Sequence, residues 1–142
     1  MSDAIDVLSS RLSVARTRIN VLASNIANAE TTRTADGTPY KRKDVVQMAI
    51  GETGGFGDEM EKAGIAKPIV AAVVEDQSAP RLVHQPGHPD ADANGMVAFP
   101  NINVVTTMTD LMSASRLYQA AVTALESARR MAGDALNISF RS

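Results

Sequence analysis

The sequence predicts an α+β protein in which long N- and C-terminal helices pack as an antiparallel coiled-coil-like pair, with a small β-rich insertion between them. Apolar residues recur at steps of three and four near both ends of the 142-residue chain, which is the heptad pattern of packed helices. Between these ends, short runs rich in Val and Ile alternate with turn residues, a pattern typical of strands. We therefore expect segments 1–32 and 103–142 to form a helical assembly domain, and residues 33–102 a small β-rich middle domain with its connecting loops.

The first helix is expected from about Asp6 to Asn28, with Ser2 or Asp3 near its N-terminal cap. No proline or glycine interrupts this stretch. Its heptad seam consists of Ile5, Leu8, Leu12, Ala15, Ile19, Leu22 and Ile26. Because most helix stability in water comes from packing, this seam requires a partner helix.

The chain supplies that partner in a second helix from about Asn103 to Ile138, capped by Asn101 or Asn103. Its seam consists of Val104, Met108, Leu111, Ser115, Tyr118, Val122, Leu125, Arg129, Ala132 and Leu136. Each helix also carries a second apolar column, made of Val7, Val14 and Val21 in the first and Ala114, Ala121 and Ala128 in the second. Since a two-helix pair buries one seam, we expect these second columns to pack against other copies or other proteins.

The middle of the chain is expected to contain short strands separated by turn-rich loops. The expected strands are Tyr40–Ile50, Ile65–Val74, Arg81–His84 and Gly95–Phe99. An ordered loop with a turn at Asp36-Gly37 precedes them. The glycine-rich stretch Gly51–Gly64 is expected to be a loop with a short helical turn at Glu59–Lys62.

Composition excludes several classes of protein. The net charge of −2 gives no field that would attract nucleic acid, and the absence of cysteine excludes disulfides and thiolate metal sites. No apolar run is long enough to cross a membrane, so we expect no direct membrane insertion. Arg11, Arg16 and Arg18 interrupt the N-terminal region, which therefore does not look like a cleavable signal peptide.

The loop before the second helix holds both histidines and the residues that most resemble a ligand site. Asp90 to Gly95 matches the first half of an EF-hand calcium loop, with Asp90, Asp92 and Asn94 as ligands, but Asn101 stands where that loop needs Glu. Zinc at His84 and His88 would lack a third ligand at a dependable spacing. We favour a rigid structural loop made of turn-forming residues, namely Pro86, Gly87, His88, Pro89, Asp90, Asp92, Asn94 and Gly95.

No motif for a catalytic nucleophile occurs, so we expect no enzyme activity, no cofactor and no small-molecule substrate. One stretch remains to be explained. Asn20, Asn25 and Asn28 are poor helix formers near the end of the first helix. Their presence suggests specific hydrogen bonds, either to the last helix or to a neighbouring molecule.

The stretch from Asn20 to Thr32 resembles the N-terminal motif of the bacterial flagellar axial proteins, which include the rod, hook and hook-associated proteins. The segments Pro39–Val46, Pro86–Gly95 and Pro100–Val105 narrow this resemblance to the proximal rod subunits, and Ser113–Tyr118 is similar to their C-terminal segment. A hook or distal-rod subunit is disfavoured, because those chains usually have a longer middle domain.

The resemblance implies a structural subunit of the periplasmic rod in the flagellar basal body. Such a protein is exported by the flagellar type III apparatus without a cleaved signal. Its implied partners are copies of itself, other rod proteins, the rod-to-MS-ring adaptor and the MS ring. The residues expected at subunit contacts are Leu8, Leu12, Ile19, Leu22, Asn25, Ile26, Asn28, Thr32, Arg33, Met108, Leu111, Tyr118, Val122 and Leu125. The alternative is a secreted calcium-dependent binding module that uses the Asp90–Asn94 loop.

Overall fold

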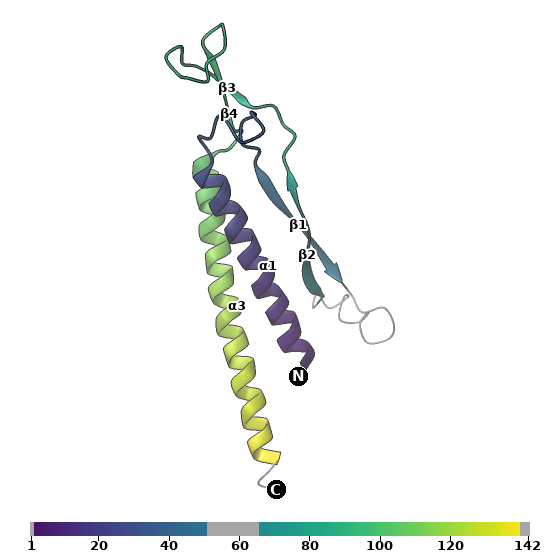
Figure 1. Cartoon of the computed structure of the whole chain (residues 1–142). Coiled ribbons are helices and arrows are strands. Elements are labelled where there is room, and N and C mark those ends of the chain that lie inside the picture. The colour runs from purple at the N-terminus through teal and green to yellow at the C-terminus, as the bar shows by residue number, and fades with distance from the viewer. Residues whose placement is uncertain (1, 51–65, 140–142) are drawn as a thin grey trace.

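Two long helices dominate the structure, a computed structural model that describes residues 2–50 and 66–139. Helix α1 spans Ser2–Ala27 and helix α3 spans Val104–Ser139. They lie side by side and run in opposite directions, so that α3 extends past the N-terminus of α1 (Figure 1). The predicted α+β class and antiparallel helical pair are therefore confirmed. The first helix begins at Ser2 and not near Asp6, so it starts earlier than expected.

The interface between the helices uses a wider set of residues than the heptad seam. The buried apolar residues of the pair are Val7, Val14, Ala15, Leu22, Ala114, Ala121 and Leu125. Our expectation that the second columns would be left for other molecules is therefore wrong for Val7, Val14, Ala114 and Ala121. These valines and alanines are covered within the chain, where α1 packs against α3 and the two strands β1 and β2.

The N-terminus of α3 is capped by Asn103, one of the two predicted capping residues. The Asn103 Oδ1 atom accepts a hydrogen bond from the backbone N–H of Thr106 at 3.1 Å. The Thr107 hydroxyl donates to the Asn103 carbonyl at 2.7 Å, and Thr107 is buried. The first bond satisfies a backbone N–H that a helix start otherwise leaves unpaired, and the second gives the buried Thr107 hydroxyl a partner.

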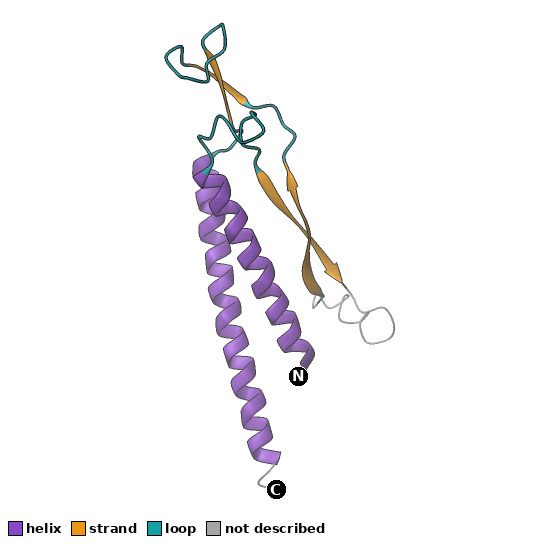
Figure 2. Ribbon diagram, in the orientation of Figure 1, coloured by secondary structure: helices purple, strands orange, loops and turns teal. Residues whose placement is uncertain are grey.

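The strands form two separate antiparallel ribbons, each of two strands (Figure 2). Strand β1, Lys43–Ile50, pairs with β2, Lys67–Glu75, and β3, Arg81–His84, pairs with β4, Met96–Phe99. All four expected strands are present, with bounds shifted by up to three residues. The register of β1–β2 changes after Val46 and leaves Ala71 as an extra residue in a bulge. The loop expected at Gly51–Gly64 and its helical turn lie outside the described residues.

The two ribbons occupy different places. The β1–β2 ribbon runs back along α1, whereas the β3–β4 ribbon lies beyond the end of the helical pair where α1 ends and α3 begins (Figure 1). Cross-strand pairing puts Val46, Met48, Ile50 and Val74 on one face of the β1–β2 ribbon, and all four side chains are exposed. Neither described helix is long and apolar enough to cross a membrane.

Candidate functional site

The polar residues singled out in the sequence meet where α1 ends, at a junction between the helical pair and both ribbons. Asn25 is central to this junction, with 1% of its surface exposed. Its carboxamide forms hydrogen bonds with the backbone of Lys43, the first residue of β1, and with the hydroxyl of Tyr40. We expected Asn25 to contact the last helix or a neighbouring molecule. The structure instead directs its side chain into the chain, toward the root of the β1–β2 ribbon.

Asn28 closes the end of α1. Its Nδ2 atom donates to the Ser24 carbonyl at 2.9 Å, and its Oδ1 atom accepts from the Thr31 hydroxyl at 3.2 Å. The Ser24 carbonyl also accepts from the backbone N–H of Asn28 at 3.1 Å, so the backbone and the side chain of Asn28 both bind it. The half-buried Asn28 side chain therefore directs the chain out of the helix.

Thr32 and Arg33 connect the chain after α1 to the loop before β4. The Thr32 hydroxyl donates to Asp90 Oδ2 at 2.8 Å, and Arg33 Nε lies 3.0 Å from Asp90 Oδ1. Thr32 and Asp90 are 58 residues apart in the sequence. Although the Arg33 side chain is exposed, the two bonds to one carboxylate fix this loop against the end of the helical pair.

The loop from Pro86 to Gly95 is built by its own hydrogen bonds, as the structural interpretation expects. Asp92 Oδ1 accepts from the backbone N–H groups of Asn94 and Met96 at 2.8 and 2.9 Å. Gly95 has a positive φ of 73°, and a Cβ there would lie 3.0 Å from Pro86 Cβ. Within the loop, His88, Asp90 and Gly95 are half-buried, and Pro86, Gly87, Pro89, Asp92 and Asn94 are exposed.

The carboxylates that the calcium alternative needs have partners within the chain. The Asp90 carboxylate is bonded to Thr32 and Arg33, and Asp92 Oδ1 is bonded to backbone N–H groups. Asp90 also binds His88, because its backbone N–H donates to His88 Nδ1 at 3.1 Å. Across residues 2–50 and 66–139, no three His, Cys, Asp or Glu side chains gather closely enough to hold a metal ion.

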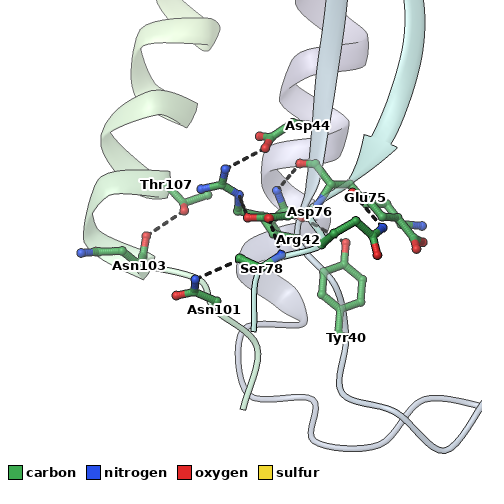
Figure 3. Close-up of polar contacts among 12 residues, drawn as sticks. Tyr40, Arg42, Asp44, Glu75, Asp76, Ser78, Asn101, Asn103 and Thr107 are labelled. Carbon is green, nitrogen blue, oxygen red and sulfur yellow. Dashed lines mark hydrogen bonds and ion pairs between the residues drawn. The ribbon is translucent and has the colours of Figure 1, made fainter. Parts of the chain in front are cut away.

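A group of charged side chains at the root of the β1–β2 ribbon was missed in the sequence (Figure 3). Arg42 lies 2.7 Å from Asp44 and 3.6 Å from Asp76, which follows the last residue of β2. The backbone N–H of Asp76 donates to the Arg42 carbonyl at 2.8 Å, which extends the ladder by one bond. A hydrogen bond from the backbone N–H of Ser78 lowers the pKa of Asp76 below its ordinary 3.8, with further contributions from the Ser78 side chain and Arg42.

The seam residues that we expected at subunit contacts differ in how far the folded chain covers them. Leu22 and Leu125 are buried, and Met108 is exposed. The half-buried members are Leu8, Leu12, Ile19, Ile26, Leu111, Tyr118 and Val122. The pair therefore leaves part of its apolar surface available for contacts with other molecules.

An exposed apolar face lies near the start of α3. Val105, Met108 and Met112 are spaced by three and four residues, so they lie on one side of the helix. Their exposed fractions are 75%, 50% and 60%. We call these three residues the α3 apolar face. The sequence analysis predicted only Met108 as part of an apolar face, because Val105 and Met112 lie outside the predicted seam.

Two family models of flagellar rod proteins match the N-terminal and the C-terminal segments of the chain. A family model described as "Flagella basal body rod protein" matches residues 5–33, which include most of α1 and the Thr32–Arg33 pair. A second model, "Flagellar basal body rod FlgEFG protein C-terminal", matches residues 93–138, which include β4 and most of α3.

Curated relatives match across nearly the whole chain. The flagellar basal-body rod protein FlgC of Salmonella typhimurium is 42% identical over 89% of this chain and 88% of its own length. The FlgC proteins of Borreliella burgdorferi and Bacillus subtilis are 38% and 36% identical, each over 95% of both chains. The chain therefore belongs to the FlgC family of flagellar basal-body rod proteins, which are structural and not enzymes.

Proposed function

We propose that this protein forms part of the proximal rod, the hollow drive shaft that transmits motor torque and passes exported subunits. In this proposal, segments 1–32 and 103–142 form the assembly domain, and residues 33–102 form the outer middle domain. The partners are copies of the chain, other rod proteins, the rod-to-MS-ring adaptor and the MS ring. The chain reaches the periplasm through the flagellar type III apparatus, without a cleaved signal.

The observation that carries the proposal is the apolar surface that the helical pair leaves exposed. Monomeric proteins rarely keep three large apolar side chains exposed on one helix face without a partner, as the α3 apolar face does. The 36-residue α3 is also longer than the 26-residue α1, and its C-terminal part extends past the end of its partner. Both features are typical of a helix that completes its packing against neighbouring molecules.

The exposure of each side chain indicates whether it can contact a neighbouring subunit directly. The α3 apolar face, Arg33 and the half-buried seam residues can reach a neighbour directly. Leu22, Asn25 and Leu125 are covered within the chain and would act by holding the assembly surface in shape. Heterologous contacts that do not close into a ring produce a helical filament, which is the form a shaft requires.

Met112→Asp tests the proposal without disturbing the buried interface between the helices. We expect the variant chain to keep its helix content by circular dichroism, because Met112 is exposed. Cells that carry it should lose swimming and lack complete rods in isolated basal bodies, because a charge in an apolar contact is costly to bury.

Ser113→Asp is the matched control, because it adds the same charge at the adjacent exposed position of α3. Cells with the control variant should swim normally. Intact rods and normal swimming in Met112→Asp cells would refute the assembly role of the α3 apolar face.

A further inference from the structure

The β1–β2 ribbon packs against a single helix. Among the described helices and strands, α1 is the only element that lies against it (Figure 1). Its opposite face carries the exposed side chains Val46, Met48, Ile50 and Val74. A two-stranded ribbon on its own is marginally stable in water. Its direction along α1 therefore depends on the packing of its two strands against that helix and on the polar contacts at its root.

The most specific polar contact between α1 and the ribbon lies at the root of the ribbon. Asn25 Nδ2 donates to the Lys43 carbonyl at 2.8 Å, while Asn25 Oδ1 accepts from the Lys43 N–H at 2.9 Å. One carboxamide thus makes with Lys43 both bonds that a paired residue of an antiparallel strand would make. The last full turn of α1 is joined to the first residue of β1 as if it were a neighbouring strand.

Only asparagine has the chemistry and length for this position. Its Oδ1 atom also accepts from the Tyr40 hydroxyl at 3.1 Å, so both lone pairs are in use. Ser24 Oγ lies 3.3 Å from Tyr40 Oη and supports the hydroxyl from the preceding position of α1. Asp would lose the donor to Lys43, and Gln would place the amide one methylene too far.

We infer that Asn25, Tyr40 and Lys43 form a clamp that sets the direction of the β1–β2 ribbon relative to the helical pair. The Asn25 clamp makes this direction depend on the last turn of α1, because an unwound turn would carry the carboxamide away from Lys43. Since the clamp acts within one molecule, the inference stands apart from the assembly proposal.

Spin-label distances in the full-length chain test the clamp directly. The chain has no cysteine, so labels attach only to introduced ones. A pair at Ala72 and Thr123 reports on the ribbon relative to α3, and a pair at Arg16 and Thr123 reports on the helical pair. These three positions are exposed. In the parent chain, we expect a narrow distribution for both pairs.

Asn25→Asp should broaden the Ala72–Thr123 distribution and leave the Arg16–Thr123 distribution narrow. The population of the clamped state should fall about tenfold or more, because a buried carboxylate would face the Lys43 carbonyl without a donor between them. Asn20→Asp is the matched control. It makes the same change at an exposed position of the same helix, and should leave both distributions unchanged.

Tyr40→Phe removes a single hydroxyl from the clamp and serves as the milder second variant. If Asn25→Asp also broadens the helix–helix distance, Tyr40→Phe decides the question and should broaden the ribbon distance alone. The clamp is refuted if neither variant changes the Ala72–Thr123 distribution selectively. A parent chain in which that distribution is already as broad as in Asn25→Asp would refute it equally.

Discussion

The helical pair and the junction at its end are held together by different interactions. Along the pair, repeated apolar side chains such as Val14, Leu22 and Leu125 are buried between α1 and α3. At the junction, single polar groups are matched to single partners, as Asn25 is to Lys43 and Asp90 to Thr32. Apolar burial has no preferred direction, whereas a buried hydrogen bond requires one geometry. The pair therefore supplies most of the cohesion, and the junction sets how the parts are oriented.

Leu125→Ala should have the largest effect on stability, because it removes apolar volume from the interface between the helices. Leu125 is 8% exposed, so its truncation leaves a cavity and should lower the free energy of unfolding by about 2–3 kcal/mol. Leu117→Ala makes the same change at a position of α3 that is 62% exposed, and should stay within about 0.5 kcal/mol. Urea unfolding followed by circular dichroism measures both. Equal losses would mean that the helices do not pack through the face described.

The contrast between the two regions also explains what the sequence could predict. The heptad steps predicted both helices and placed their ends within a few residues, because a helix face repeats every few residues. The same pattern predicted too narrow a contact stripe, because it included Ala15, Leu22 and Leu125 but not the neighbouring column. Val7, Val14, Ala114 and Ala121 are buried, and this depends on how closely two particular helices approach. A regular pattern predicts that a helix packs against a partner. It predicts less well which column of residues on that helix is buried.

The junction was less predictable, because its partners are far apart in sequence. The cluster of asparagines indicated specific hydrogen bonds, but the partner of Asn25 lies 18 residues away and that of Thr32 lies 58 residues away. Nothing periodic links these positions. The Arg42–Asp76 contact was missed for the same reason, since it depends on the register of β1 with β2.

Gly95→Ala should have an intermediate effect, confined to the loop that leads into β4. Gly95 adopts a positive φ, and an added Cβ would lie 3.0 Å from Pro86 Cβ and 3.1 Å from His84 Nε2. The strain should lower the free energy of unfolding by about 1–2 kcal/mol. Gly87→Ala is the control in the same loop, because a Cβ there meets nothing within 4 Å. Urea unfolding of the two variants gives the comparison, and similar stabilities would show that the loop does not hold Gly95 in this conformation.

Lowering the pH should have the smallest effect on stability. It should destabilise the root of the β1–β2 ribbon and not the helical pair. The pKa of Asp76 is lowered in the folded chain, mainly by the Ser78 N–H. The ionised carboxylate therefore contributes stability above its ordinary pKa of 3.8, and this contribution is lost as the pH falls through the lowered value.

The Asp76→Asn variant separates this titration from the others in the chain, because Asn keeps an oxygen for the Ser78 N–H but cannot ionise. Hydrogen exchange of the β1 and β2 amides, measured from pH 5 to pH 3, should accelerate beyond its intrinsic pH dependence in the parent chain. The variant should show a smaller change, and the amides of α1 and α3 should differ little between the two chains. If exchange accelerated equally in the ribbon and in the helices, the polar groups at the root would not stabilise the ribbon independently of the helical pair.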